Sequence, residues 1–135
     1  MSRFFSTKYN EGALDFSLFI LRLAGGGLMV KHGFDKLIHF TDTVKHFPDP
    51  IHIGPTLSLF LVIFAEFFCA VLLVFGLLTR LVVIPLVICF SVVVFLVHRG
   101  QVFGDGETAA LYLAMYLFLL FTGPGKFSLD RLIGK

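Results

Sequence analysis

Four long stretches of this 135-residue chain are apolar on every side, and they restrict its fold more than any other feature. They cover about residues 14–37, 56–78, 81–97 and 108–122. A helix needs roughly 20 apolar residues to cross a bilayer, so the last two stretches are near the lower limit. A membrane β-barrel would alternate apolar and polar residues instead. The sequence therefore predicts an all-α polytopic membrane protein, a four-transmembrane-helix bundle that forms one domain over residues 1–135.

The composition agrees with this class and excludes others. Hydrophobic residues make up 57% of the chain and charged residues 15%, against about 45–50% and about 25% in soluble domains. A net charge of +2 without a basic run gives no electrostatic footprint for nucleic acid. Two cysteines are too few for a disulfide scaffold. The expected partner is the lipid bilayer, and no nucleic acid is expected.

The connections between the stretches set an expected orientation. The longest connection covers about residues 39–55, and four crossings place both termini on one side. That side carries six basic residues, and the other carries four. The two sets are Arg3, Lys8, Arg80, Lys126, Arg131 and Lys135, and Lys31, Lys36, Lys45 and Arg99. The positive-inside rule then places both termini in the cytoplasm and the 39–55 loop outside.

Two charged residues interrupt the apolar stretches. Arg22 lies a third of the way along the first stretch, and Glu66 lies ten residues into the second. A charge near the bilayer centre costs at least ~2.5 kcal/mol, so it is usually paired and is a functional candidate by default. We predict an ion pair between Arg22 and Glu66. The pair either serves function or only fixes the register of the two helices.

Further polar residues point to a pocket at the outer mouth of the bundle. Helical spacing puts Arg22, His32 and Lys36 on one stripe of the first helix. We expect the stripe to face the interior, where Glu66 and the residues His32, Lys36, His98 and Glu107 surround a pocket. Such a pocket suits an anion, a quinone head group or a relay of protons. The spacing of these residues does not favour a metal site, and none is expected. Glu107 alternatively serves only the helix dipole.

The two cysteines lie at similar heights on neighbouring helices. Cys69 lies in the second stretch and Cys89 in the third, without a Cys-x-x-Cys pattern. They are candidates for a redox disulfide. The alternative is that both are small buried hydrophobic residues.

Several short motifs together resemble the DoxX family. They are Leu21-Arg22-Leu23 followed by three glycines, Lys31-His32-Gly33 with Lys36-Leu37, Ala65-Glu66, Gly76-Leu77-Leu78-Thr79-Arg80, and Gly123-Pro124-Gly125 with Ser128-Leu129-Asp130. The last motif is the most specific of them. The resemblance covers about residues 14–132.

The resemblance implies a small four-helix protein of the bacterial inner membrane. Its family name comes from a membrane subunit linked to thiosulfate:quinone oxidoreduction, and other members are thought to partner oxidative-stress proteins. We therefore expect a membrane subunit of a quinone-linked or oxidative-stress redox system, with quinone as the candidate ligand. No flavin, haem or iron–sulfur motif is visible, so no cofactor is expected within the chain.

Two other functions stay open from the sequence. The chain could be a non-enzymatic anchor or assembly partner of a larger complex, either with a redox partner subunit or as a homo-oligomer. A small-solute transporter is the third reading, and it is disfavoured because the chain has no inverted repeat. Whether the protein is an enzyme is not determined by its sequence.

Overall fold

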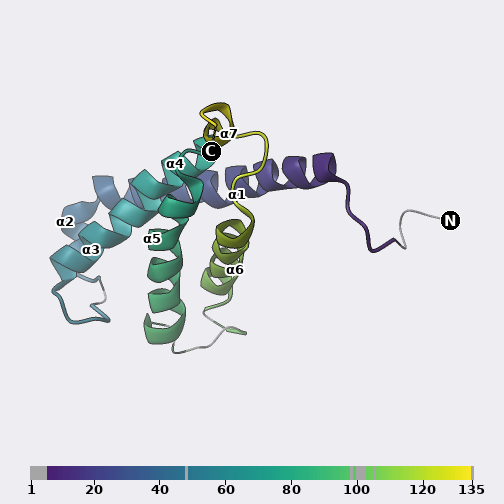
Figure 1. The fold of residues 1–135 in the computed structure, drawn as a ribbon. Helices are drawn as coiled ribbons and strands as arrows, with labels where there is room; N and C mark the ends of the chain where they lie inside the picture. Colours follow the sequence, from purple (N-terminus) through teal and green to yellow (C-terminus); the bar gives the residue numbers. More distant parts are fainter. Residues whose placement is uncertain (1–5, 48, 98, 100–102, 105, 135) are drawn as a thin grey trace.

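The computed structural model contains helices and no strands in the part of the chain that it describes, which comprises residues 6–47, 49–97, 99, 103–104 and 106–134. Figure 1 shows the elements in chain order. They are α1 (Glu11–Ile38), α2 (Phe40–Val44), α3 (Pro55–Ile63), the π-helix η2 (Phe64–Cys69), α4 (Ala70–Phe75), α5 (Thr79–Val92), the π-helix η3 (Val93–Val97), α6 (Glu107–Thr122) and α7 (Leu129–Leu132). The predicted fold class, an all-α membrane protein, is confirmed.

Three of the helical segments are long and apolar enough to cross a bilayer. They are Glu11–Ile38, Pro55–Phe75 and Thr79–Val97, and Glu107–Thr122 is a shorter apolar helix of 16 residues. The first begins three residues before the expected stretch, because Asn10 caps it. The Asn10 side chain accepts hydrogen bonds from the backbone N–H groups of Gly12 and Ala13.

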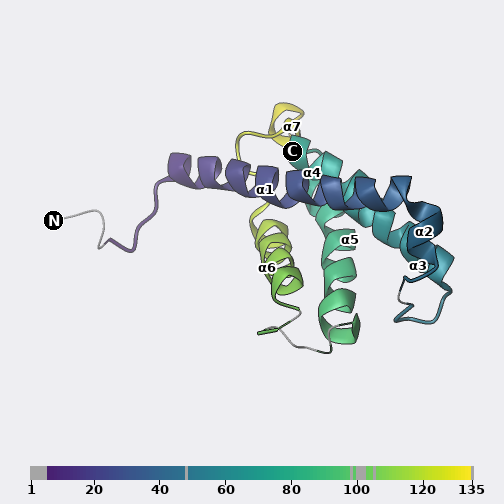
Figure 2. The same cartoon turned by 180° about the vertical axis from the view of Figure 1, so that it is seen from behind.

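The helices form two pairs that converge at one end. α1 lies along η2 and α4, and α5 lies along α6. The pairs meet where α4 turns into α5, and they spread apart toward the start of α3 and the end of η3 (Figures 1 and 2). At the far end of the molecule the backbones of α3 and α5 are therefore separated. Side chains from both helices line the space between them.

Close helix contacts hold the converging end together. Tyr116 on α6 is fully buried and donates a hydrogen bond of 2.7 Å from its hydroxyl to the carbonyl oxygen of Gly25 on α1. Its ring packs against the ring of Phe90 on α5, with 5.7 Å between the two ring centroids. Together these contacts join α1, α5 and α6 into one core, which continues through buried aliphatic residues such as Leu73 and Leu86.

Candidate functional site

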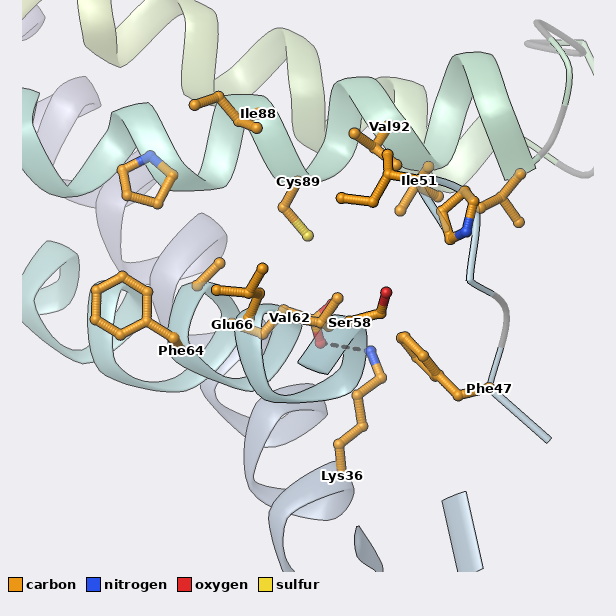
Figure 3. Close-up of a pocket in the computed structure, with 16 residues that line it drawn as sticks. Lys36, Phe47, Ile51, Ser58, Val62, Phe64, Glu66, Ile88, Cys89 and Val92 are labelled. Atoms are coloured by element: carbon orange, nitrogen blue, oxygen red, sulfur yellow. Dashed lines mark hydrogen bonds and ion pairs between the residues drawn. The ribbon is translucent and has the colours of Figure 1, made fainter. Parts of the chain in front are cut away.

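A pocket of about 440 Å³ lies between the α3–η2 segment and the α5–η3 segment. Figure 3 shows side chains from both segments facing each other across it. Most of the wall is aliphatic or aromatic, including Leu61, Val62, Phe64, Ile88, Val92 and Val93. The volume is in the range of small-molecule sites, about 300–1,000 Å³. The pocket is thus a mostly apolar site between the two helix pairs, where they diverge.

An ion pair forms the polar part of the pocket. The Lys36 ammonium group donates to Glu66 Oε1 at 2.6 Å, and both residues line the space. The Glu66 side chain is 5% exposed and that of Lys36 is 29% exposed. Lys36 lies in the last turn of α1, where the helix nears the loop. The pair therefore connects a buried carboxylate with a partly hydrated ammonium group.

Local backbone features place Glu66 in this position. Glu66 belongs to η2, and π-helical turns inside α-helices occur frequently at functional sites. Gly33 on α1 touches the same segment: a Cβ atom at Gly33 would lie 2.6 Å from the Phe67 backbone nitrogen and 2.7 Å from the Glu66 carbonyl carbon. Only glycine allows α1 to approach η2 so closely, and Lys36 follows Gly33 by less than one turn.

The predicted ion pair between Arg22 and Glu66 is wrong. Arg22 is fully buried, and its guanidinium group donates to the carbonyl oxygens of Leu73 at 3.3 Å, Val74 at 3.0 Å and Phe127. It also lies 5.5 Å from the centroid of the Phe19 ring. Because α1 starts early and is long, Arg22 lies level with the end of α4, away from Glu66. The arginine thus binds carbonyl groups at the end of α4, where the Leu73 carbonyl also accepts from the Gly76 N–H at 3.0 Å.

The C-terminal segment closes the converging end. The Asp130 carboxylate accepts hydrogen bonds from the backbone N–H groups of Leu78 at 2.7 Å and Thr79 at 2.9 Å, and the Asp130 N–H donates to the Gly76 carbonyl at 2.9 Å. Gly76 has φ +69°, and a side chain there would collide with Arg22 and Ser128. The Gly76–Arg80 and Ser128–Asp130 motifs are therefore joined by hydrogen bonds. The sequence did not predict this contact.

Two further residues of the predicted pocket, His32 and Glu107, do not line it. His32 is exposed rather than interior, and its ring meets Tyr112 edge-on at 6.5 Å between centroids. Glu107 is exposed in the first turn of α6, where it lines a separate hollow with Phe103, Ala110 and Leu111. His98 lies outside the described residues. Of the predicted pocket residues, the structure thus brings together Lys36 and Glu66.

The two cysteines have different surroundings. Both are free thiols: Cys69 is buried in the core, whereas Cys89 is half-buried and lines the pocket. In Figure 3 the Cys89 sulfur points into the space between α5 and η2. No group of three His, Cys, Asp or Glu residues within the described part of the chain could hold a metal ion. Cys89 therefore places a free thiol in the wall of the pocket, where a thiol reagent could label it.

The loop before α3 supplies the remaining wall of the pocket. Phe47, Pro50 and Ile51 line it, and Asp49 lies between them in the sequence. Asp49 accepts hydrogen bonds from Ser58 Oγ at 2.9 Å and from two backbone N–H groups, those of Ile53 at 3.0 Å and Gly54 at 2.8 Å.

The environment of Asp49 favours its charged form. Desolvation acts to raise the pKa of the Asp49 carboxyl, but the hydrogen bonds and nearby His52 outweigh it, so the pKa lies below its ordinary value. At neutral pH the carboxylate is therefore ionised and able to accept all three hydrogen bonds. The sequence signal for this role is an Asp followed closely by Gly54-Pro55, since Asp side chains often bond backbone groups in such turns.

Comparison with known proteins gives one match. The sequence matches the family model described as DoxX over residues 17–99, which is more than half of the chain. The matched range includes Arg22, Lys36, Glu66 and Cys89, and the C-terminal segment with Asp130 lies beyond it. No curated protein and no solved structure matches the sequence.

Proposed function

Because the chain belongs to the DoxX family of membrane proteins, we propose that it is the membrane subunit of a quinone-linked redox system and that the apolar pocket binds the quinone. The observation that carries the proposal is the partly buried Lys36–Glu66 ion pair at the polar part of an apolar pocket of about 440 Å³. The proposal includes a bacterial inner-membrane location with both termini in the cytoplasm.

The chemistry of the pocket suits a quinone head group. A quinone carries carbonyl oxygens that accept hydrogen bonds, and the Lys36 ammonium group is a donor that does not accept. A quinol carries hydroxyl groups that donate, and the Glu66 carboxylate is an acceptor. The pair therefore offers one partner to each redox form, while Val62, Ile88 and Val92 surround the ring with apolar side chains.

The residues of this chain would transfer protons to the quinone and position it in the pocket. Conversion of a quinone to a quinol takes up two electrons and two protons. In this proposal the electrons come from a redox cofactor held by a partner subunit, and Glu66 passes protons to the ring from water near Lys36. The isoprenoid tail would lie along the apolar wall.

The test compares two carboxylate variants in lipid nanodiscs. Binding of decylubiquinol, whose hydroxyl groups would donate to Glu66, is measured for the wild type, for E66Q and for E107Q. E107Q is the matched control, since Glu107 does not line this pocket. We expect E66Q to weaken binding by about tenfold or more, the effect of losing a hydrogen bond to a charged group. E107Q should bind as the wild type does.

Two results would contradict the redox proposal. One is the absence of saturable decylubiquinol binding to the wild type, and the other is equal decylubiquinol binding by E66Q and the wild type. If the protein then purified with a second chain in fixed stoichiometry, the non-enzymatic anchor would be the better explanation.

A further inference from the structure

The two ends of the pocket meet different surroundings. Phe64 of η2 and Ile88 of α5 stand on opposite walls, away from the loop (Figure 3). They are 46% and 59% exposed. Both belong to helices long and apolar enough to cross the bilayer, so their exposed surface contacts lipid tails. The pocket therefore has an apolar rim on the lipid side.

The loop before α3 covers the other end. Phe47, Pro50 and Ile51 point apolar side chains at the pocket, while His46 and His52 of the same loop are exposed. Figure 3 shows Phe47 and Ile51 at the end of the pocket opposite Phe64. We call Phe47, Pro50 and Ile51 the stopper. Phe47 and Pro50 are half-buried, whereas Ile51 lines the pocket and leaves 47% of its surface exposed. The polar neighbours face outward, as expected at a boundary with water.

Asp49 fixes the stopper to α3. Its carboxylate binds Ser58 Oγ in the first turns of α3 at 2.9 Å and the N–H groups of Ile53 and Gly54. Ser58 is buried and itself lines the pocket. The Asp49 side chain therefore binds both the backbone of its own loop and the wall of the pocket. In sequence it directly precedes Pro50 and lies two residues from Phe47 and from Ile51.

We propose that the pocket fills sideways from the lipid phase and that Asp49 keeps its water end closed by holding the stopper in place. The occupant is an amphiphile dissolved in the bilayer, with a hydrogen-bonding head at Lys36 and Glu66 and an apolar tail that leaves between Phe64 and Ile88. For the identity of the head group this inference rests on the proposed function. The route of entry does not depend on it.

Cys89 reports which phase reaches the pocket. Protein in nanodiscs, where both membrane faces are open to solution, is treated with an uncharged alkyl maleimide or with a sulfonated maleimide, and modification is followed by mass spectrometry. The C89S variant measures any background at Cys69, which is buried. In the wild type we expect the sulfonated reagent to modify Cys89 more than about tenfold more slowly, because a fixed charge is strongly disfavoured in an apolar membrane site.

Variants of the loop test the role of Asp49. D49A should raise the rate with the sulfonated reagent by about tenfold and leave the rate with the alkyl maleimide nearly unchanged, because water then enters past the stopper. D42A is the matched control, since Asp42 is exposed on α2 and does not line the pocket. I51A opens the stopper without removing the Asp49 hydrogen bonds, and it should act like D49A even if D49A does not fold.

Two outcomes would overturn the inference. The first is equal modification of wild-type Cys89 by both reagents, which would mean that the pocket opens to water. The second is a sulfonated-reagent rate that neither D49A nor I51A raises. Protection of Cys89 by decylubiquinone is measured separately. If decylubiquinone does not protect, the quinone proposal fails while the lateral route stands.

Discussion

At the scale of single residues, Gly33 determines how closely α1 approaches the segment that carries Glu66. A Cβ atom there would lie 2.6 Å from a backbone nitrogen, and backbone cannot move aside as a flexible side chain does. We expect G33A to lower the free energy of unfolding by about 1–3 kcal/mol, the usual cost of overpacking. It should also weaken quinone binding, because displacement of η2 separates Lys36 from Glu66.

Gly27 provides the matched control on the same helix. A Cβ atom at Gly27 meets no other atom within 4 Å. G27A should therefore leave stability unchanged or raise it by up to about 1 kcal/mol, since alanine favours the helix. Denaturation by sodium dodecyl sulfate in mixed micelles, followed by circular dichroism, measures both variants. Equal stabilities for G33A and G27A would show that the close approach is not a constraint.

The partner of a buried charge is the residue-scale feature that the sequence did not predict. Hydropathy identified Arg22 and Glu66 as unusual, and both are buried. The pairing failed because it depends on how α1 slides along its neighbour. Arg22 and Lys36 are 14 residues apart, or about 21 Å along the helix. Replacing one cation by the other beside Glu66 therefore needs a shift of about 21 Å between α1 and η2, and the sequence does not record that register.

At the scale of elements, α5 begins at a cap supplied from a distant part of the chain. The first residue before α5, Leu78, has φ +52°, and its N–H group and that of Thr79 donate to Asp130. Asp130 is buried. The negative carboxylate also complements the positive end of the helix. The start of α5 thus depends on the C-terminal segment.

D130N tests this dependence. An amide retains one acceptor oxygen but turns NH₂ donors toward a backbone N–H group, so one hydrogen bond is lost. We expect a destabilisation of about 1–3 kcal/mol. D42N, an exposed position on α2, should have little effect. Thermal unfolding in detergent measures both. Wild-type stability of D130N would show that the cap is not needed.

The elements themselves were largely predictable, whereas their irregular parts were not. Apolar runs and Gly/Pro breaks indicate where helices lie, because burial in lipid requires backbone hydrogen bonds within each segment. The π-helical turns at Phe64–Cys69 and Val93–Val97 have no comparable signal. They arise where one extra residue is accommodated in packing, and a local sequence does not record that.

At the scale of the whole molecule, hydrogen bonds join the first half of α1 to the C-terminal segment at one end of the bundle. The Lys126 N–H donates to the Asp15 carboxylate at 3.1 Å, and Arg22 donates to the Phe127 carbonyl. The Lys36–Glu66 pair and Asp49 lie toward the other end, near the loop. Four crossings would place both termini on one side of the membrane, and from the count of basic residues we predict that this side is the cytoplasm.

A charge-shift experiment tests the orientation. A green fluorescent protein fused to the C-terminus should fluoresce, and alkaline phosphatase fused there should be inactive, because both report a cytoplasmic end. Replacing Lys8, Lys126 and Arg131 with Gln lowers the count on that side from six to three against four on the other. The bias then reverses, and phosphatase activity should appear in part of the population.

The matched control removes basic residues from the opposite side. Replacing Lys31, Lys45 and Arg99 with Gln leaves six against one, so phosphatase at the C-terminus should stay inactive. None of these six residues lines the pocket, so the replacements leave its lining unchanged. An active phosphatase on the wild-type C-terminus would place the termini outside. The loop that carries the stopper would then face the cytoplasm, and the lateral route to the pocket would be the same from either orientation.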